Sequence, residues 1–127
     1  MLAWTGLRHR YDSGAEIAFG DFALPAGRHL LLRGASGAGK STLLALLAGL
    51  LRVQQGELEV AGTALTSLGP RALDAWRGAT LGVVPQRLHL SEALTVAENL
   101  ALPALAAGQG AEPARAAELL AALDVAE

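Results

Sequence analysis

The chain has 127 residues, 52% of them hydrophobic and 17% charged, so it is long enough for one domain with a packed core and too apolar to remain disordered. A formal net charge of −2 offers no basic field for nucleic acid, and the absence of cysteine excludes a disulfide scaffold and a thiolate metal site. The longest apolar run, 42–51, is about half of the roughly 20 residues that cross a bilayer, and the N-terminus lacks the apolar core of a signal peptide. We therefore expect a globular cytoplasmic domain.

Strand and helix patterns alternate along the chain. Segments rich in aromatic and β-branched residues, joined by a turn at 11–15, predict strands at 2–10 and 16–24. Continuous apolar runs predict two further strands, at 29–33 and 80–84. Alternation of apolar and acidic residues predicts a third, at 56–60. Four helices are predicted at 40–51, at 70–77, from Thr95 to a proline at position 103 that ends or kinks the helix, and at 112–125. This alternation indicates an α/β fold.

A glycine-rich stretch lies between a predicted strand and a predicted helix, and it matches the phosphate-loop pattern G-x-x-x-x-G-K-[ST] at each fixed position. Its residues are Gly34, Ala35, Ser36, Gly37, Ala38, Gly39, Lys40 and Ser41. Glycines let the backbone turn several N–H groups toward an anion, and the helix that follows adds the positive end of its dipole. We expect Lys40 to reach the β- and γ-phosphates and Ser41 to offer its hydroxyl to Mg²⁺, with Thr42 deeper in the first helical turn.

Two alternatives bear on this loop. A glycine-rich turn without a ligand is disfavoured because Lys40 is the only lysine beside nine arginines, and the planar fork of arginine does not replace a compact ammonium between phosphates. The loop alone does not name the reaction, since small-molecule kinases carry nearly the same string. In those kinases the loop follows the first strand, whereas here 33 residues precede it, which counts against a kinase.

Downstream residues resemble the nucleotide-binding domain of ABC transporters, and the resemblance covers all 127 residues. The stretch 49–62 looks like the helix end, turn and strand of that family, and 81–103 is similar to the stretch around its Q-loop glutamine, here Gln86. The spacing from Gln86 through His89 to 95–99 matches the lipoprotein-release and macrolide-export branch. Two prolines common in the family are missing from the turn at 53–55 and from position 92.

The resemblance implies two further nucleotide contacts. Tyr11 occupies the place of the adenine-stacking aromatic, where a ring is worth about 1–3 kcal/mol by analogy with bases stacked on aromatic side chains. Since stacking needs a ring rather than a hydroxyl, phenylalanine or tryptophan at position 11 is expected to keep ATP binding. The alternative is a tyrosine that only packs at the end of a strand.

Gln86 follows the predicted strand 80–84, at the carboxyl end where open α/β sheets bind ligands. The resemblance implies that its amide holds Mg²⁺ or the attacking water. The alternative is an ordinary loop glutamine, which is our interpretation of Gln54, Gln55 and Gln109.

The segment that follows Gln86 is assigned to partner binding. His89 lies at no ligand spacing from the other two histidines, so a metal site there is disfavoured. We expect 87–94 to form the surface that meets a membrane-embedded partner. Thr95 and Glu98 have capping-box spacing, and we assign them to the start of a helix.

The family completes its site with an LSGGQ signature, an apolar strand ending in Asp-Glu, a loop after that strand and a switch histidine, and none of these occurs in the 127 residues. The resemblance therefore implies the N-terminal part of one nucleotide-binding domain. The fold would be a P-loop NTPase with a RecA-like core and N-terminal antiparallel strands, incomplete C-terminally. Its parts would be the P-loop at 34–42, the Q-loop around Gln86 and the start of a helical subdomain at 95–127.

ATP and Mg²⁺ are the implied ligands. The implied partners are a transmembrane permease subunit and a second nucleotide-binding subunit, with no nucleic acid, and the implied place is the inner face of the cell membrane. The complete domain would hydrolyse ATP to drive transport, whereas these 127 residues alone are expected to be inactive and to fold poorly. Two alternatives remain: a nucleotide-binding module without a role in transport, and a small-molecule kinase.

Overall fold

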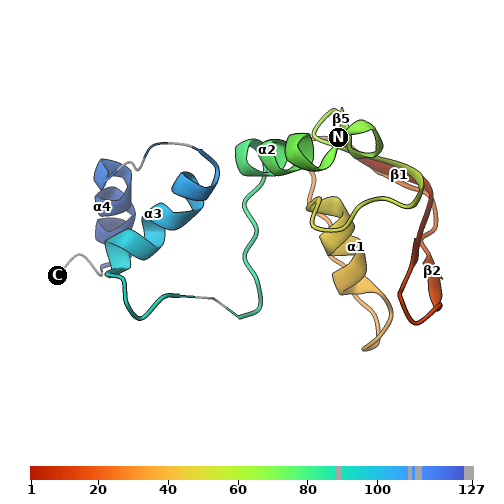
Figure 1. Ribbon diagram of the computed structural model, residues 1–127, viewed down its shortest axis with the longest axis horizontal. Helices are drawn as coiled ribbons and strands as arrows, with labels where there is room; N and C mark the ends of the chain where they lie inside the picture. Colours follow the sequence, from red (N-terminus) through yellow and green to blue (C-terminus); the bar gives the residue numbers. More distant parts are fainter. Residues whose placement is uncertain (88–89, 109, 111–112, 125–127) are drawn as a thin grey trace. The chain divides into compact units, whose positions relative to one another are not determined.

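A computed structural model of the chain describes residues 1–87, 90–108, 110 and 113–124 (Figure 1). The chain divides into two compact units, Met1–Asp74 and Ala75–Glu127. Among the described residues, no helix combines the length and the apolar character needed to span a membrane.

The first unit is built on an antiparallel sheet centred on β1, Leu2–Arg10. One edge of β1 pairs with β2 (Glu16–Ala18) and β3 (Phe22–Leu24), and the other edge pairs with β4 (Gln55–Val60). The short strand β5, Thr63–Ala64, continues the sheet beyond β4. The predicted strand 16–24 is therefore confirmed at both ends and interrupted in between.

The interruption has a physical cause. After β2 one more backbone bond forms, from Phe19 N to Leu7 O at 2.9 Å. Side chains then take over from the ladder: the indole Nε1 of Trp4 donates to Gly20 O at 2.7 Å, and Asp21 Oδ1 accepts from Gly6 N at 2.8 Å. Gly6 has a φ of +57°, a left-handed backbone that glycine adopts at little cost. The edge of β1 bends here and its partner strand is split in two.

The core of the first unit combines the sheet with α1, Lys40–Leu47. Leu7 of β1, Leu58 of β4 and Leu46 of α1 are the most completely buried side chains. Leu43, one turn before Leu46, is buried too, whereas Leu44 is exposed. The apolar helix therefore buries one stripe, and the alternation in β4 puts Leu58 inside.

The helices agree with the predictions near their starts. A 3₁₀ turn at Leu65–Ser67 precedes α2, which begins at Pro70 and continues to Thr80. Thr95 caps α3 (Val96–Ala106) through a complete capping box with Glu98. Pro103 lies inside α3 and does not end it, so of the two predicted effects, an end or a kink, the first is wrong. The last helix is α4, Pro113–Ala122.

Two predicted strands, 29–33 and 80–84, are wrong. Residues 29–33 pair with no strand and Thr80 still belongs to α2, while Leu31 is 79% and Val84 is 86% exposed. A continuous apolar run becomes a strand only where neighbouring strands pair with it and other elements cover its faces. Nothing in the described part of the chain offers either segment such neighbours, so the sheet seen here is antiparallel.

Candidate phosphate- and nucleotide-binding site

The glycine-rich loop at 34–39 leads directly into α1, as predicted. Gly37 and Gly39 have φ values of +81° and +82°, a left-handed backbone that other residues adopt only with strain. Position 39 also excludes a larger residue for a second reason, because a Cβ there would overlap Cδ1 of Ile17 in β2. The second strand therefore packs against the loop at the point where the helix begins.

The start of α1 is open to an anion. Gly39 is its N-cap, no side chain caps the helix, and no acidic residue lies in its first turn. The first intrahelical bond of this turn, Leu43 N to Gly39 O at 2.9 Å, leaves the preceding N–H groups for another acceptor. Such groups, together with the helix dipole, favour a phosphate.

Lys40 supplies the positive charge at this opening. Its Nζ donates to the carbonyl oxygens of Gly34 at 2.8 Å and Ala35 at 2.6 Å, so the ammonium lies over the loop that it follows. An ammonium has three donors, and these two bonds leave one for a further acceptor. The donor set of backbone N–H groups and one compact cation fits a phosphate group.

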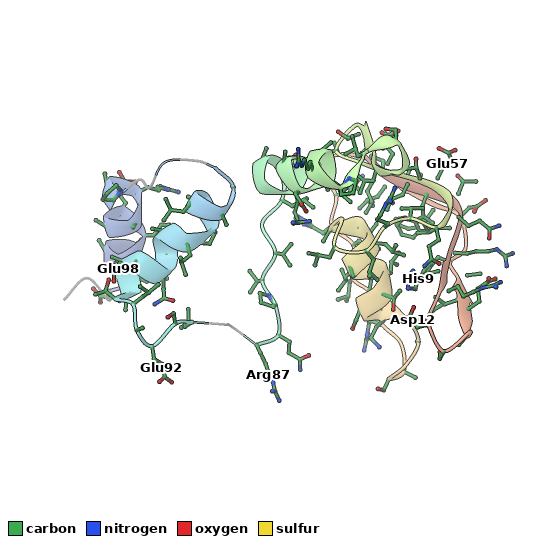
Figure 2. The ribbon with its side chains drawn as sticks, in the orientation of Figure 1. His9, Asp12, Glu57, Arg87, Glu92 and Glu98 are labelled. Atoms are coloured by element: carbon green, nitrogen blue, oxygen red, sulfur yellow. The ribbon has the colours of Figure 1, made fainter. Side chains whose placement is uncertain are left out.

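The structure brings Tyr11 to the first turn of α1. Its hydroxyl lies 2.6 Å from Oγ1 of Thr42, while Ser41 is exposed on the same turn. In Figure 2 the labelled His9 and Asp12, which flank Tyr11 in the sequence, lie at the end of β1 that is next to α1. Tyr11 is 37% exposed, so part of its ring remains open to a ligand.

Gln86 belongs to the other unit. It lies in an exposed bend after α2, whereas the loop and Tyr11 belong to Met1–Asp74. Its role at the magnesium ion therefore stays a prediction. Leu88 and His89 lie outside the described residues, and among the described ones no cluster of His, Asp and Glu could hold a metal ion.

Two polar residues were missed by the sequence analysis. The amide of Gln54 accepts from Arg10 N at 2.7 Å and donates to Arg10 O at 3.2 Å, so it is not the ordinary loop glutamine that we expected. These two bonds join the end of β1 to the residue that precedes β4. No local pattern signals it, because the two residues are 44 positions apart. Gln55 likewise belongs to β4 rather than to a loop.

The second missed residue is Asn99. Its Oδ1 accepts from Ser91 N at 2.8 Å, and its Nδ2 donates to the carbonyls of Ser91, Leu94 and Thr95 at 3.0–3.2 Å. This side chain ties the turn at 91–95 to the first turn of α3. An asparagine directly after a capping box was the available signal.

The loop, its lysine and the helix after it define a P-loop nucleotide-binding fold, and comparison with known proteins gives its family. The family model described as ABC transporter matches residues 20–127. The macrolide export ATP-binding/permease protein MacB of Rhodopseudomonas palustris (strain HaA2) is 39% identical over 128 residues, which cover 96% of this chain and 20% of that protein. The lipoprotein-releasing system ATP-binding protein LolD of Chromohalobacter salexigens is 38% identical, covering 95% of this chain and 54% of that protein.

A solved structure agrees with these relatives. The dimeric post-hydrolysis state of the ATP-binding cassette MJ0796, bound to ADP and Pi, matches with a TM-score of 0.83 at 26% identity, over 98% of this chain and 57% of that one. The chain therefore belongs to the ABC transporter family, and the expected branch and P-loop fold are confirmed. It spans about half the length of LolD and a fifth of the length of MacB.

Proposed function

We propose that the chain binds Mg–ATP at the loop 34–39 and the first turn of α1. The observation that carries this proposal is the Lys40 ammonium, held by two loop carbonyls over a helix start that no side chain caps. ADP and Pi are bound by the cassette MJ0796, to which this chain is similar, and nucleotide binding there supports the same ligand class here.

Each remaining ligand group has a residue to receive it. The exposed part of the Tyr11 ring would stack on the adenine, and the exposed hydroxyl of Ser41 would bind Mg²⁺. Gln86 is the further candidate for Mg²⁺ or the attacking water. Its side chain is exposed in a bend after α2, where an amide oxygen is accessible as a metal ligand without titrating.

In the whole protein we propose that ATP hydrolysis drives transport across a membrane. Two relatives are named for lipoprotein release and for macrolide export, and the second is named as a permease as well. We therefore propose a transmembrane permease as partner and a second nucleotide-binding subunit, in keeping with the dimeric cassette MJ0796. The protein would then lie at the inner face of the cell membrane.

The surface for the permease is proposed at 87–94. Leu90 is exposed there, and Asn99 ties the turn that follows Leu90 to α3. An apolar side chain on an ordered turn suits a helix of a membrane partner.

The first experiment is an ATP titration of the full-length protein and its Lys40→Ala variant. Loss of the ammonium removes charge-assisted hydrogen bonds, so ATP affinity is expected to fall by roughly 10- to 100-fold while the circular dichroism spectrum is unchanged. Arg71→Ala, which removes an exposed cation from α2, is the matched control and should bind ATP like the parent. Equal affinity in parent and Lys40→Ala would reject the site.

A further inference from the structure

The Tyr11 ring is held at two points. Its hydroxyl meets Oγ1 of Thr42 at 2.6 Å, and its ring meets the His9 ring edge-on, with centroids 5.0 Å apart and planes at 85°. His9 is buried, and its Nδ1 has no hydrogen-bond partner among the described residues, so its contact with Tyr11 is one of ring packing. Two side chains from different elements therefore fix one aromatic ring.

The backbone of Tyr11 is fixed as well. Its N–H donates to Ala15 O at 2.8 Å, and its carbonyl accepts from Gly14 N at 2.9 Å, which closes the turn between β1 and β2. With the main chain anchored, the ring retains only its side-chain torsions. The contacts with His9 and Thr42 restrict these torsions too.

The hydroxyl pair links the two ends of the proposed nucleotide site. Thr42 lies in the first turn of α1, which follows the phosphate loop, whereas Tyr11 directly follows β1, 31 positions earlier. Each hydroxyl has one donor hydrogen. If Tyr11 donates to Thr42, the hydrogen of Thr42 stays available to a phosphate oxygen, so the contact with Tyr11 does not compete with a contact to phosphate.

We propose that Thr42 is a positioning residue for the Tyr11 ring, so that recognition of the base depends on the tyrosine hydroxyl and not on the ring alone. This inference rests on the proposed function, because it concerns the same ATP site. It revises the expectation that phenylalanine replaces Tyr11 without loss. A phenylalanine ring keeps the stacking face and the contact with His9, but it is no longer tied to α1.

The test is a double-mutant cycle in the full-length protein, made of Tyr11→Phe, Thr42→Val and the double variant. Each is titrated with ATP and with inorganic tripolyphosphate, which has the phosphates without the base. Tyr11→Phe should lower ATP affinity by roughly 2- to 10-fold, the worth of one hydrogen bond, and leave tripolyphosphate affinity unchanged. In the Tyr11→Phe background, Thr42→Val should cost less ATP affinity than it does in the parent. Any direct contact of Thr42 with phosphate affects both ligands equally and cancels in the cycle.

Two variants separate positioning from structure. Thr42→Ser keeps the hydroxyl and should retain ATP affinity, whereas Thr5→Val removes an exposed hydroxyl elsewhere on β1 and should change nothing. Undiminished ATP binding by Tyr11→Phe, or additive losses in the cycle, would overturn the inference while the proposed function stands. Failure of the parent to bind ATP and tripolyphosphate in a Lys40-dependent way would reject the proposed function itself.

Discussion

Each of the two units of this chain is stabilised internally by a different kind of contact. In Met1–Asp74, strands and α1 bury a shared core, and side-chain bonds join residues far apart in sequence, such as Arg10 with Gln54. In the second unit no residue of α3 or α4 is buried, and the turn before α3 is fixed by bonds to Asn99 and Glu98 nearby. The proposed base and phosphate contacts therefore lie on a packed core, whereas the described end of the proposed partner surface, 90–94, lies in a loop and turn before α3.

The open surface of the second unit fits this difference. An apolar groove of about 580 Å³ runs between α3 and α4, with Leu100, Ala104 and Leu120 among its lining residues. A helix pair that buries so little of its apolar surface gains little stability from packing. Substitutions should consequently act on stability in the first unit and on local order in the second.

The largest effect is expected in the core. Leu46→Ala should lower the free energy of unfolding by about 2–5 kcal/mol, because this side chain is fully buried between α1 and the sheet. The matched change Leu105→Ala, on exposed surface of α3, should cost about 0.5 kcal/mol or less. Urea unfolding followed by circular dichroism measures both, and equal losses would contradict the contrast between the units.

A smaller and local effect is expected at Asn99. Asn99→Ala removes its bonds to 91–95 and should destabilise the start of α3 by about 1–2 kcal/mol, with faster hydrogen exchange at the Ser91 amide. Exchange of the Leu46 amide should not change. Asn99→Asp keeps an acceptor for Ser91 N and should preserve protection of that amide while the donors are lost. Protection lost equally in both variants would assign the order of this turn to something other than Asn99.

The same contrast explains which elements of the fold could be predicted from the sequence. Local signals were sufficient at 34–42, at Pro70 and at the Thr95–Glu98 capping box, because a few adjacent residues determine a loop or a helix start. Antiparallel strands were predicted where their partners lie in this chain. The apolar runs 29–33 and 80–84 were misjudged because a pattern of side chains cannot supply a neighbouring strand.

The candidate site likewise has one part that the sequence predicts and one part that depends on the fold. The loop and Lys40 follow from a contiguous motif, so residue types and spacing were enough to predict them. The bonds of Tyr11 to Thr42 and of Gln54 to Arg10 depend on how the sheet registers against the rest of the unit. Contacts of this kind appear only once the chain is folded.

The smallest effect concerns two carboxylates, one in each unit. Hydrogen bonds and charge from Arg10, and then from Arg8, lower the pKa of Glu16, whereas bonds from the backbone N–H and the hydroxyl of Thr95 lower the pKa of Glu98. A carboxyl whose pKa is lower in the folded state stabilises above its unfolded pKa of about 4.3, and the contribution is lost as pH falls through the folded value. Both units should therefore lose a little stability in acid.

Salt should distinguish the two carboxylates, because ions screen an exposed ion pair far more than a hydrogen bond to a neutral donor. In NMR titrations, raising the salt from 0.01 M to roughly 1 M should move the pKa of Glu16 back toward its ordinary value and leave the pKa of Glu98 nearly unchanged. Arg10→Gln should reproduce the effect of salt at Glu16, and Thr95→Val should raise the pKa of Glu98 at either salt concentration. An equal response of both carboxylates to salt would mean that charge, rather than the capping hydrogen bonds, also governs the start of α3.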